Sequence, residues 1–132
     1  MKLNPETIIQ REIISYLESI GGRVLRLSSQ GTMIRGFLVK NNSKYSPKGM
    51  SDLAFISNGS ITFLEVKTPS ELTYIRKHHA RILEGNFAED DKKLNRYRDQ
   101  IMFISEMRYF GCLADFVSSV ADVRALLDSS VT

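Results

Sequence analysis

Asp52, Glu65 and Lys67 are the residues whose types and spacing in this sequence are best suited to chemistry. The two acids lie on either side of Asn58-Gly59, a dipeptide that strongly favours a two-residue β-hairpin turn. In such a hairpin the residues that flank the turn face each other, and counting outward from them places Asp52 directly opposite Glu65. Side chains alternate along a strand, so Glu65 and Lys67 share one face. The three charged groups are therefore expected to converge at the open end of the hairpin.

Two carboxylates in directly opposed positions predict a site for a divalent cation. Their Cβ atoms would be about 4.5–5.5 Å apart, a separation at which like charges destabilise each other. Mg²⁺ typically takes one or two carboxylates and completes its coordination with water and phosphate oxygens. An ammonium group beside it can orient an attacking water or stabilise charge that develops on a phosphate. The pattern thus indicates metal-assisted chemistry on a phosphate.

The alternative is a pair of exposed acids at the strand ends, with Lys67 in a surface salt bridge. A lone Glu-x-Lys recurs by chance and by itself favours this alternative. The aspartate across a defined hairpin favours the metal site, and Phe63-Leu64 place Glu65 at the end of a buried strand, where an idle acid pair is costly. Because Lys67 lies at a strand end, Lys67→Ala is expected to leave folding nearly intact.

The elements that must position these residues follow the order α-β-β-β-β-α-α-β-α. Asn4-Pro5-Glu6 is a typical helix start, and Gly21-Gly22 ends that helix. Farther along, Gly85-Asn86 separates one helix from a longer one that ends at Gly111. The pattern predicts an α/β domain with a mixed sheet. The expected strands cover 23–27, 36–40, 52–57, 60–67 and 113–117; the expected helices cover 5–20, 70–84, 89–110 and 119–127, and a polar loop covers 41–51.

Composition is typical of one soluble globular domain over 1–132, because 42% of the 132 residues are hydrophobic and 25% are charged. No run approaches the roughly 18 consecutive apolar residues of a membrane span, and no signal peptide is expected. The single cysteine, Cys112, excludes an internal disulfide framework and fits a reducing cytoplasm. We expect it to be a small core residue rather than a nucleophile.

The net charge of +3 fits a nucleic-acid partner, although many unrelated proteins share it. Basic residues gather in two stretches, at 40–48 and 76–81, and for either one alone solvated surface is the favoured interpretation. His78-His79 lacks the spacing of zinc ligands, so surface or DNA contact is the better interpretation. The two stretches contain Lys40, Lys44 and Lys48, and Arg76, Lys77, His78, His79 and Arg81.

Together these motifs resemble the signature of the PD-(D/E)xK nucleases, with Ser51-Asp52 followed by Glu65-Val66-Lys67. Ser51 replaces the usual proline at a position that carries no metal ligand. The surrounding residues resemble the VRR-NUC branch, known from stand-alone bacteriophage and bacterial proteins and from the C-terminal domain of the Fanconi-associated nuclease. The resemblance covers about residues 5 to 123 and rests on Gln10, Gly21-Gly22 with Val24-Leu25-Arg26, Lys48-Gly49-Met50-Ser51-Asp52, Glu65-Val66-Lys67, Gln100 and Gly111.

The resemblance implies a restriction-endonuclease-like fold, in which helices flank a mixed central sheet. It implies that Asp52, Glu65 and the carbonyl of Val66 bind Mg²⁺ or Mn²⁺ and that Lys67 assists the attacking water. Gln10 lies where archaeal Holliday-junction resolvases carry a metal-linked glutamate, and VRR-NUC proteins often have glutamine there. Two assignments stay open. Glu6 could join the metal site or be only a helix-start acid, and Gln100 could support the site, face DNA or be an ordinary polar helix residue. The segment between Lys67 and Gln100 is longer than in minimal members, and its role is not assigned.

The resulting hypothesis is a metal-dependent DNA endonuclease, selective for branched DNA such as four-way junctions and acting as a homodimer in a bacterial or phage-infected cytoplasm. One alternative is a catalytically silent nucleic-acid-binding module on the same fold. Another is a monomeric nuclease without structural preference. The basic stretches at 40–48 and 76–81 would form a phosphate-binding surface, with strongly salt-dependent affinity.

Overall fold

The computed structural model describes residues 3–27, 32–34, 37–39 and 48–129. The order of elements is the one expected from the sequence, with one additional strand and one additional helix. The elements are α1 (Pro5–Ser19), β1 (Arg23–Arg26), β2 (Thr32–Ile34), β3 (Phe37–Val39), β4 (Leu53–Ser57), β5 (Ser60–Val66), α2 (Pro69–Lys77), α3 (His79–Glu84), α4 (Lys92–Tyr109), β6 (Leu113–Val117) and α5 (Val120–Asp128).

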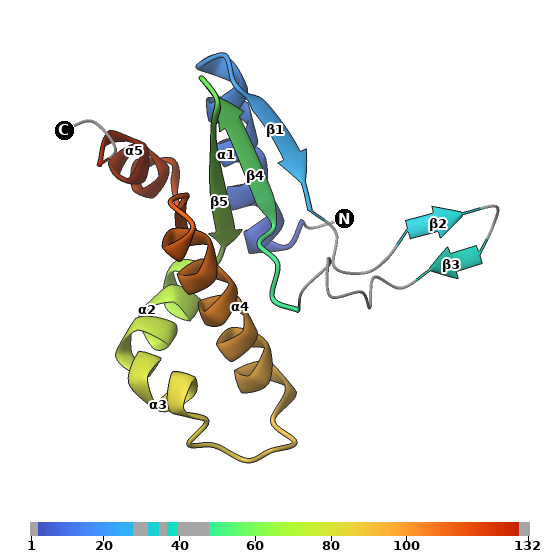
Figure 1. The fold of residues 1–132 in the computed structure, drawn as a ribbon, viewed down its shortest axis with the longest axis vertical. Helices are drawn as coiled ribbons and strands as arrows, with labels where there is room; N and C mark the ends of the chain where they lie inside the picture. The colour runs from blue at the N-terminus through green and yellow to red at the C-terminus, as the bar shows by residue number, and fades with distance from the viewer. Residues whose placement is uncertain (1–2, 28–31, 35–36, 40–47, 130–132) are drawn as a thin grey trace.

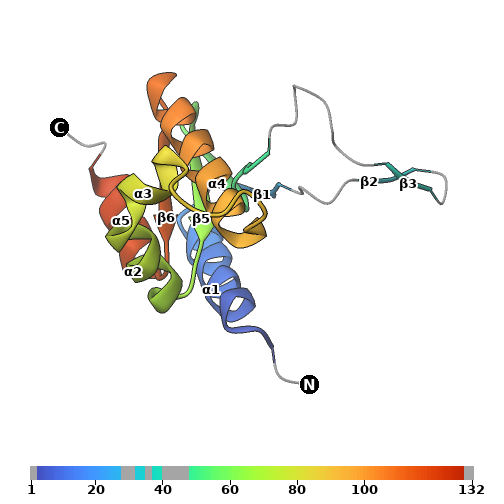
Figure 2. The same ribbon diagram turned by 90° about the horizontal axis from the view of Figure 1, so that it is seen from below.

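A four-stranded mixed sheet with the order β1-β4-β5-β6 forms the centre of the fold. Figure 1 shows β1, β4 and β5 side by side, and β6 is labelled in Figure 2. β1, β4 and β5 are antiparallel neighbours, whereas β6 runs parallel to β5. The chain reaches β6 through a crossover that contains α2, α3 and α4, because a parallel neighbour requires a long connection. β2 and β3 pair with each other in a separate two-stranded sheet. The predicted α/β fold with a mixed sheet is confirmed.

The hairpin predicted at Asn58-Gly59 is confirmed. Ser57 pairs with Ser60, and the register runs from there to Leu53 opposite Leu64. Asn58 and Gly59 have φ angles of 50° and 77°, so both central residues of the turn have the positive φ that a type I′ turn requires. Since the register has no bulge within the paired residues, Asp52 follows on opposite Glu65.

Helices cover both faces of the sheet and bury a separate core on each. On one face α2, α3 and α4 pack on β6, and Phe63 of β5 joins them through an edge-on contact with Phe103. On the other face α1 and α5 pack on Leu64 and Val66 of β5. In Figure 2, β5 accordingly lies between α1 and α4. Because Phe63 and Glu65 lie on the same side of β5, the alternation turns Glu65 toward α4.

Three expectations need correction or remain open. The helix expected over 70–84 is two helices, because His78, with φ −108° and ψ 18°, leaves the helical conformation between α2 and α3. Residues 32–34 form β2, a strand that was not among those expected from the sequence. Most of the polar loop at 41–51 lies outside the described residues. None of the described helices is both long and apolar enough to cross a membrane.

Candidate active site

A polar cleft of about 430 Å³ opens at the end of the sheet where β5 meets α2. Asp52 immediately precedes β4, Glu65 is the second-to-last residue of β5, and Lys67 immediately follows β5. The hairpin therefore places all three residues at this end of the sheet. The helices α1 and α4 supply the remaining walls. The lining residues are Asn4, Glu6, Thr7, Gly49, Met50, Asp52, Glu65, Lys67, Arg96 and Gln100.

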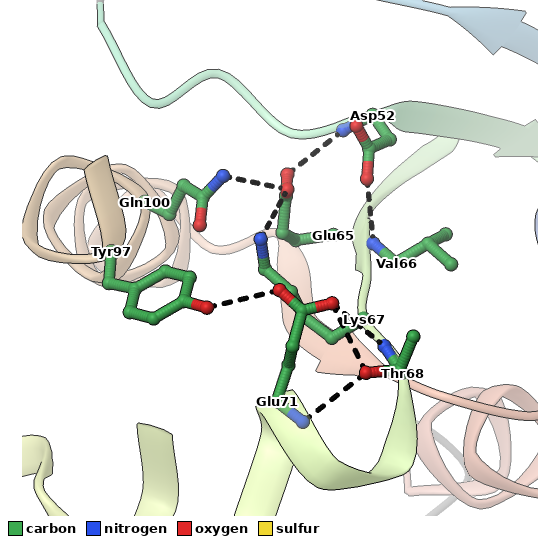
Figure 3. Close-up of polar contacts among 8 residues, drawn as sticks. All are labelled: Asp52, Glu65, Val66, Lys67, Thr68, Glu71, Tyr97 and Gln100. Atoms are coloured by element: carbon green, nitrogen blue, oxygen red, sulfur yellow. Dashed lines mark hydrogen bonds and ion pairs between the residues drawn. The ribbon is translucent and has the colours of Figure 1, made fainter. Parts of the chain in front are cut away.

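Asp52 and Glu65 are held together by reciprocal hydrogen bonds across the hairpin (Figure 3). The backbone N–H of Asp52 donates to Glu65 Oε2 over 3.1 Å, and the backbone N–H of Val66 donates to Asp52 Oδ2 over 2.8 Å. Each carboxylate is therefore anchored to the backbone of the opposite strand. These side-chain hydrogen bonds extend the backbone hydrogen-bonding pattern of β4 and β5 by one residue pair, and they hold the two acids beside each other.

Lys67 and Gln100 both contact the remaining oxygen of Glu65. Gln100 Nε2 donates to Glu65 Oε1 over 2.9 Å, and Lys67 Nζ lies 3.6 Å from the same atom. Lys67 also lies over the ring of Tyr97, 5.0 Å from its centre. Only 2% of the Lys67 surface and 3% of the Glu65 surface is exposed. The burial of Lys67 contradicts the premise that this strand-end residue lies outside the core. We therefore expect its removal to destabilise the fold, because Glu65 and Asp52 would lose their nearest cation.

Without a bound divalent metal ion, the two carboxyl groups resist full ionisation. Burial, reinforced by the negative charge of Asp52, raises the pKa of Glu65 to about 9, although Lys67 opposes the shift. Burial also raises the pKa of Asp52, against the hydrogen bond from Val66. At neutral pH the pair therefore retains a proton, which a divalent cation would displace.

Glu71 and Tyr97 join the site although the sequence patterns did not single them out. Tyr97 Oη donates to Glu71 Oε2 over 3.0 Å, and burial together with this hydrogen bond raises the pKa of Tyr97 to about 12. Burial alone would raise the pKa of Glu71, but Tyr97, Lys67 and Thr68 together hold it below its usual range. The sequence feature that could have pointed to Glu71 is the capping box of α2, which Thr68 and Glu71 form directly after Lys67.

Glu6 lines the cleft, whereas Gln10, one helical turn later, does not line it. Burial raises the pKa of Glu6, and the adjacent Glu71 and Asp52 charges raise it further while Lys67 opposes them. Gln10 is half-buried on α1, and its assigned role stays a prediction. Of the two α1 residues considered for the site, Glu6 therefore lines the cleft together with Asp52 and Glu65, although it could have been only a helix-start acid.

None of the described basic residues of the two stretches lines the cleft, and Cys112 does not line it either. The basic residues at 76–81 belong to α2, α3 and the residue between them, and none of them lines the cleft. In the other basic stretch, Lys48 is exposed, and Lys40 and Lys44 lie outside the described residues. Cys112 is a half-buried free cysteine.

The loop that carries Asp52 is pressed against α4 at Gly49. Gly49 has a φ of +78°, and a Cβ atom there would overlap the backbone of Asp99, immediately before Gln100. Only glycine allows this approach, since it combines a left-handed conformation with the absence of a side chain. The contact fixes Asp52 relative to the helix that holds Gln100.

The residues of the cleft fit a hard divalent cation. No group of three or more His, Cys, Asp and Glu side chains in the described ranges could hold a metal by itself. The site instead offers two carboxylates, as expected for Mg²⁺, which keeps several waters. Gln100 Oε1 is buried, lines the same cleft and lacks a hydrogen-bond donor among the described residues. Water bound to a cation would supply such a donor.

Comparison with solved structures identifies the fold. A structure described as a VRR_NUC domain matches 96% of this chain and 97% of its own length, with 21% sequence identity and a TM-score of 0.54. The chain therefore has the restriction-endonuclease-like fold of a VRR_NUC domain, as the sequence motifs predicted. No family model and no curated protein sequence matches the chain.

Proposed function

We propose that this protein is a DNA endonuclease that hydrolyses phosphodiester bonds with Mg²⁺ or Mn²⁺. The observation that carries the proposal is the pair of buried Glu65 and half-buried Asp52, with the buried Lys67 Nζ 3.6 Å from Glu65, in a cleft of a VRR_NUC fold. Burying an acid and a lysine costs stability. No packing role explains this cluster, so chemistry is the better explanation.

The side chains have distinct tasks in the proposed hydrolysis. Asp52 and Glu65, with the carbonyl of Val66, would hold the cation, which lowers the pKa of bound water and polarises the phosphate. Lys67 offers its ammonium group to the attacking water or to a phosphate oxygen, and Glu65 and the ring of Tyr97 hold that group in place. Gln100 fixes the position of Glu65 by its hydrogen bond.

A catalytically silent DNA-binding module on the same fold is the main rival. Such a module needs a basic surface for the phosphates. It does not need the pair of Asp52 and Glu65, because uncompensated carboxylates repel phosphates. The acids and the lysine are all present and mutually positioned. This arrangement favours the enzyme.

Metal removal tests the proposal. We expect excess EDTA to stop DNA cleavage, Mg²⁺ or Mn²⁺ to restore it, and Ca²⁺ to support only DNA binding, because Ca²⁺ prefers more ligands and a looser geometry. The measurement is the rate of cleavage of linear duplex, flap, splayed-arm and four-way DNA by wild-type protein and by Asp52→Asn. Asp115→Asn, which removes an acid from a surface salt bridge with Arg108, is the matched control. Undiminished wild-type cleavage in EDTA would refute the metal mechanism.

We further propose that the active form is a symmetric homodimer that prefers branched DNA. One chain carries a single Asp52–Glu65 site, whereas resolving a four-way junction needs cuts in two strands. Two-fold dimers are the commonest oligomers and supply two related sites. We expect a dimeric mass in sedimentation at micromolar concentration together with faster cleavage of four-way than of linear DNA. A monomeric mass with equal cleavage of both substrates would contradict this part and leave the nuclease proposal standing.

A further inference from the structure

Among the described residues that line the cleft, only Lys67 and Arg96 are basic. Arg96 lies on α4 four residues before Gln100, so the two side chains are neighbours on the same helix face. Unlike Lys67, Arg96 is exposed at the surface. Its guanidinium group therefore lies at the mouth of the cleft, between the acids and solvent.

Within the described ranges the guanidinium group has no hydrogen bond or salt bridge, although its positive charge opposes the rise in the pKa of Asp52. The salt bridges within the described ranges join Lys67 to Glu65 and Arg108 to Asp115, and none involves Arg96. No hydrogen bond of the Arg96 side chain is found there either. Arg98, two residues later, differs in this respect, because its Nε donates to the carbonyl of Leu83 over 3.1 Å. Arg98 thus ties α4 to α3, whereas Arg96 has no hydrogen-bond acceptor among the residues that the structure describes.

The start of α4 adds positive charge beside Arg96. Lys92 and Lys93 occupy the first turn, which contains no acidic residue. The carboxylate of the N-cap residue Asp91 accepts a hydrogen bond from the backbone N–H of Leu94 over 3.0 Å, so it is engaged with the helix end. Lys93 Nζ lies 5.8 Å from the centre of the Tyr97 ring, the same ring that Lys67 approaches. The basic groups therefore continue from inside the cleft to the surface along Tyr97 and Arg96.

We propose that Arg96 is a substrate-binding residue that holds a backbone phosphate of the DNA strand at the mouth of the cleft, next to the phosphate being cleaved. This inference rests on the proposed nuclease function and deepens it. Guanidinium binds phosphate through two parallel hydrogen bonds, which fixes orientation as well as position. Lys93 contributes charge to the same phosphate-binding surface.

The test compares Arg96→Ala and Arg96→Lys with Arg124→Ala, which removes the same charge from the exposed face of α5, where Arg124 lies over Tyr16. Binding of a labelled DNA duplex is measured in EDTA over a series of NaCl concentrations, and kcat and KM are measured with Mn²⁺. We expect Arg96→Ala to raise Kd and KM about tenfold at nearly constant kcat. It should also reduce the slope of log Kd against log salt by about one. Arg96→Lys should restore the slope but only part of the affinity, and Arg124→Ala should resemble wild type.

Two results would overturn the inference. One is wild-type Kd, KM and salt slope in Arg96→Ala; the other is a lower kcat with unchanged Kd, which would mean that Arg96 acts only through Asp52. Wild-type protein that binds DNA but does not cleave it refutes the nuclease, while the binding comparison in EDTA still decides the role of Arg96. Wild-type protein that neither binds nor cleaves DNA refutes both. Thermal unfolding confirms that the variants are folded, and Arg96→Gln replaces the alanine variant if that one unfolds.

Discussion

Replacing Lys67 with methionine is expected to reduce metal-dependent DNA cleavage by about 10³-fold, the effect of losing a positioned proton-transfer or charge-stabilising group. Methionine keeps much of the volume of the lysine stem, so the change removes the ammonium group with little loss of packing. The measurement is kcat/KM on the best DNA substrate. DNA affinity in Ca²⁺ should change much less than the rate, because Lys67 is nearly fully buried and contacts Glu65 rather than the exposed surface.

Lys77→Met is the matched control for this variant, since Lys77 is an exposed lysine in the last turn of α2. It should retain the wild-type rate. Lys67→Met should also unfold at a lower temperature than wild type in metal-free buffer, because Lys67 is the cation closest to the buried carboxyls. Cleavage by Lys67→Met at the wild-type rate would remove Lys67 from the mechanism, whatever its effect on stability.

Replacing Glu65 with glutamine is expected to raise the stability of the metal-free protein at neutral and alkaline pH. The folded-state pKa of Glu65, about 9, lies above the ordinary value of 4.5, so the folded protein holds a proton that the unfolded chain releases. The stability that this proton contributes is complete below about pH 4.5 and is lost as the pH rises toward about 9. The loss is at most about 1.4 kcal/mol per pH unit. Glutamine resembles the protonated carboxyl and removes the dependence.

The measurement is the free energy of unfolding in EDTA across this pH window for wild type, Glu65→Gln and the control Glu106→Gln, which changes an exposed acid of α4. Only Glu65→Gln should flatten the curve, with a residual fall due to Asp52. Mg²⁺ should stabilise wild type at neutral pH much more than Glu65→Gln, because it replaces the proton on the carboxyl. Wild-type stability that increases with pH throughout the window would contradict a buried, protonated Glu65.

The central hairpin could be predicted from the sequence because its signals are local. Asn58-Gly59 accepts the positive φ angles of the turn, and strand alternation then fixes which residues face each other. The opposition of Asp52 and Glu65 follows from counting alone. The closeness of Gln100 to this pair depended on the family resemblance, since nothing local relates α4 to β5.

The rest of the site depends on packing between distant segments. Glu71 has a complete local explanation as a capping residue, so its approach to Tyr97 became visible only when α2 and α4 were placed. The rotation of α1 about its axis, which directs Glu6 rather than Gln10 into the cleft, is likewise set by its apolar contacts with the sheet. The break at His78 has no glycine or proline to announce it.

The contact between Gly49 and Asp99 affects how the cleft would bind a cation. With no space between the loop and α4, Asp52 and Gln100 cannot change their separation without moving the helix itself. Asp52, and Glu65 through its hydrogen bond with Gln100, are thus preorganised: the entropy of arranging them is lost when the chain folds, not when the ion arrives. Metal affinity should then follow the integrity of this single backbone contact, even though neither Gly49 nor Asp99 offers the ion a side chain.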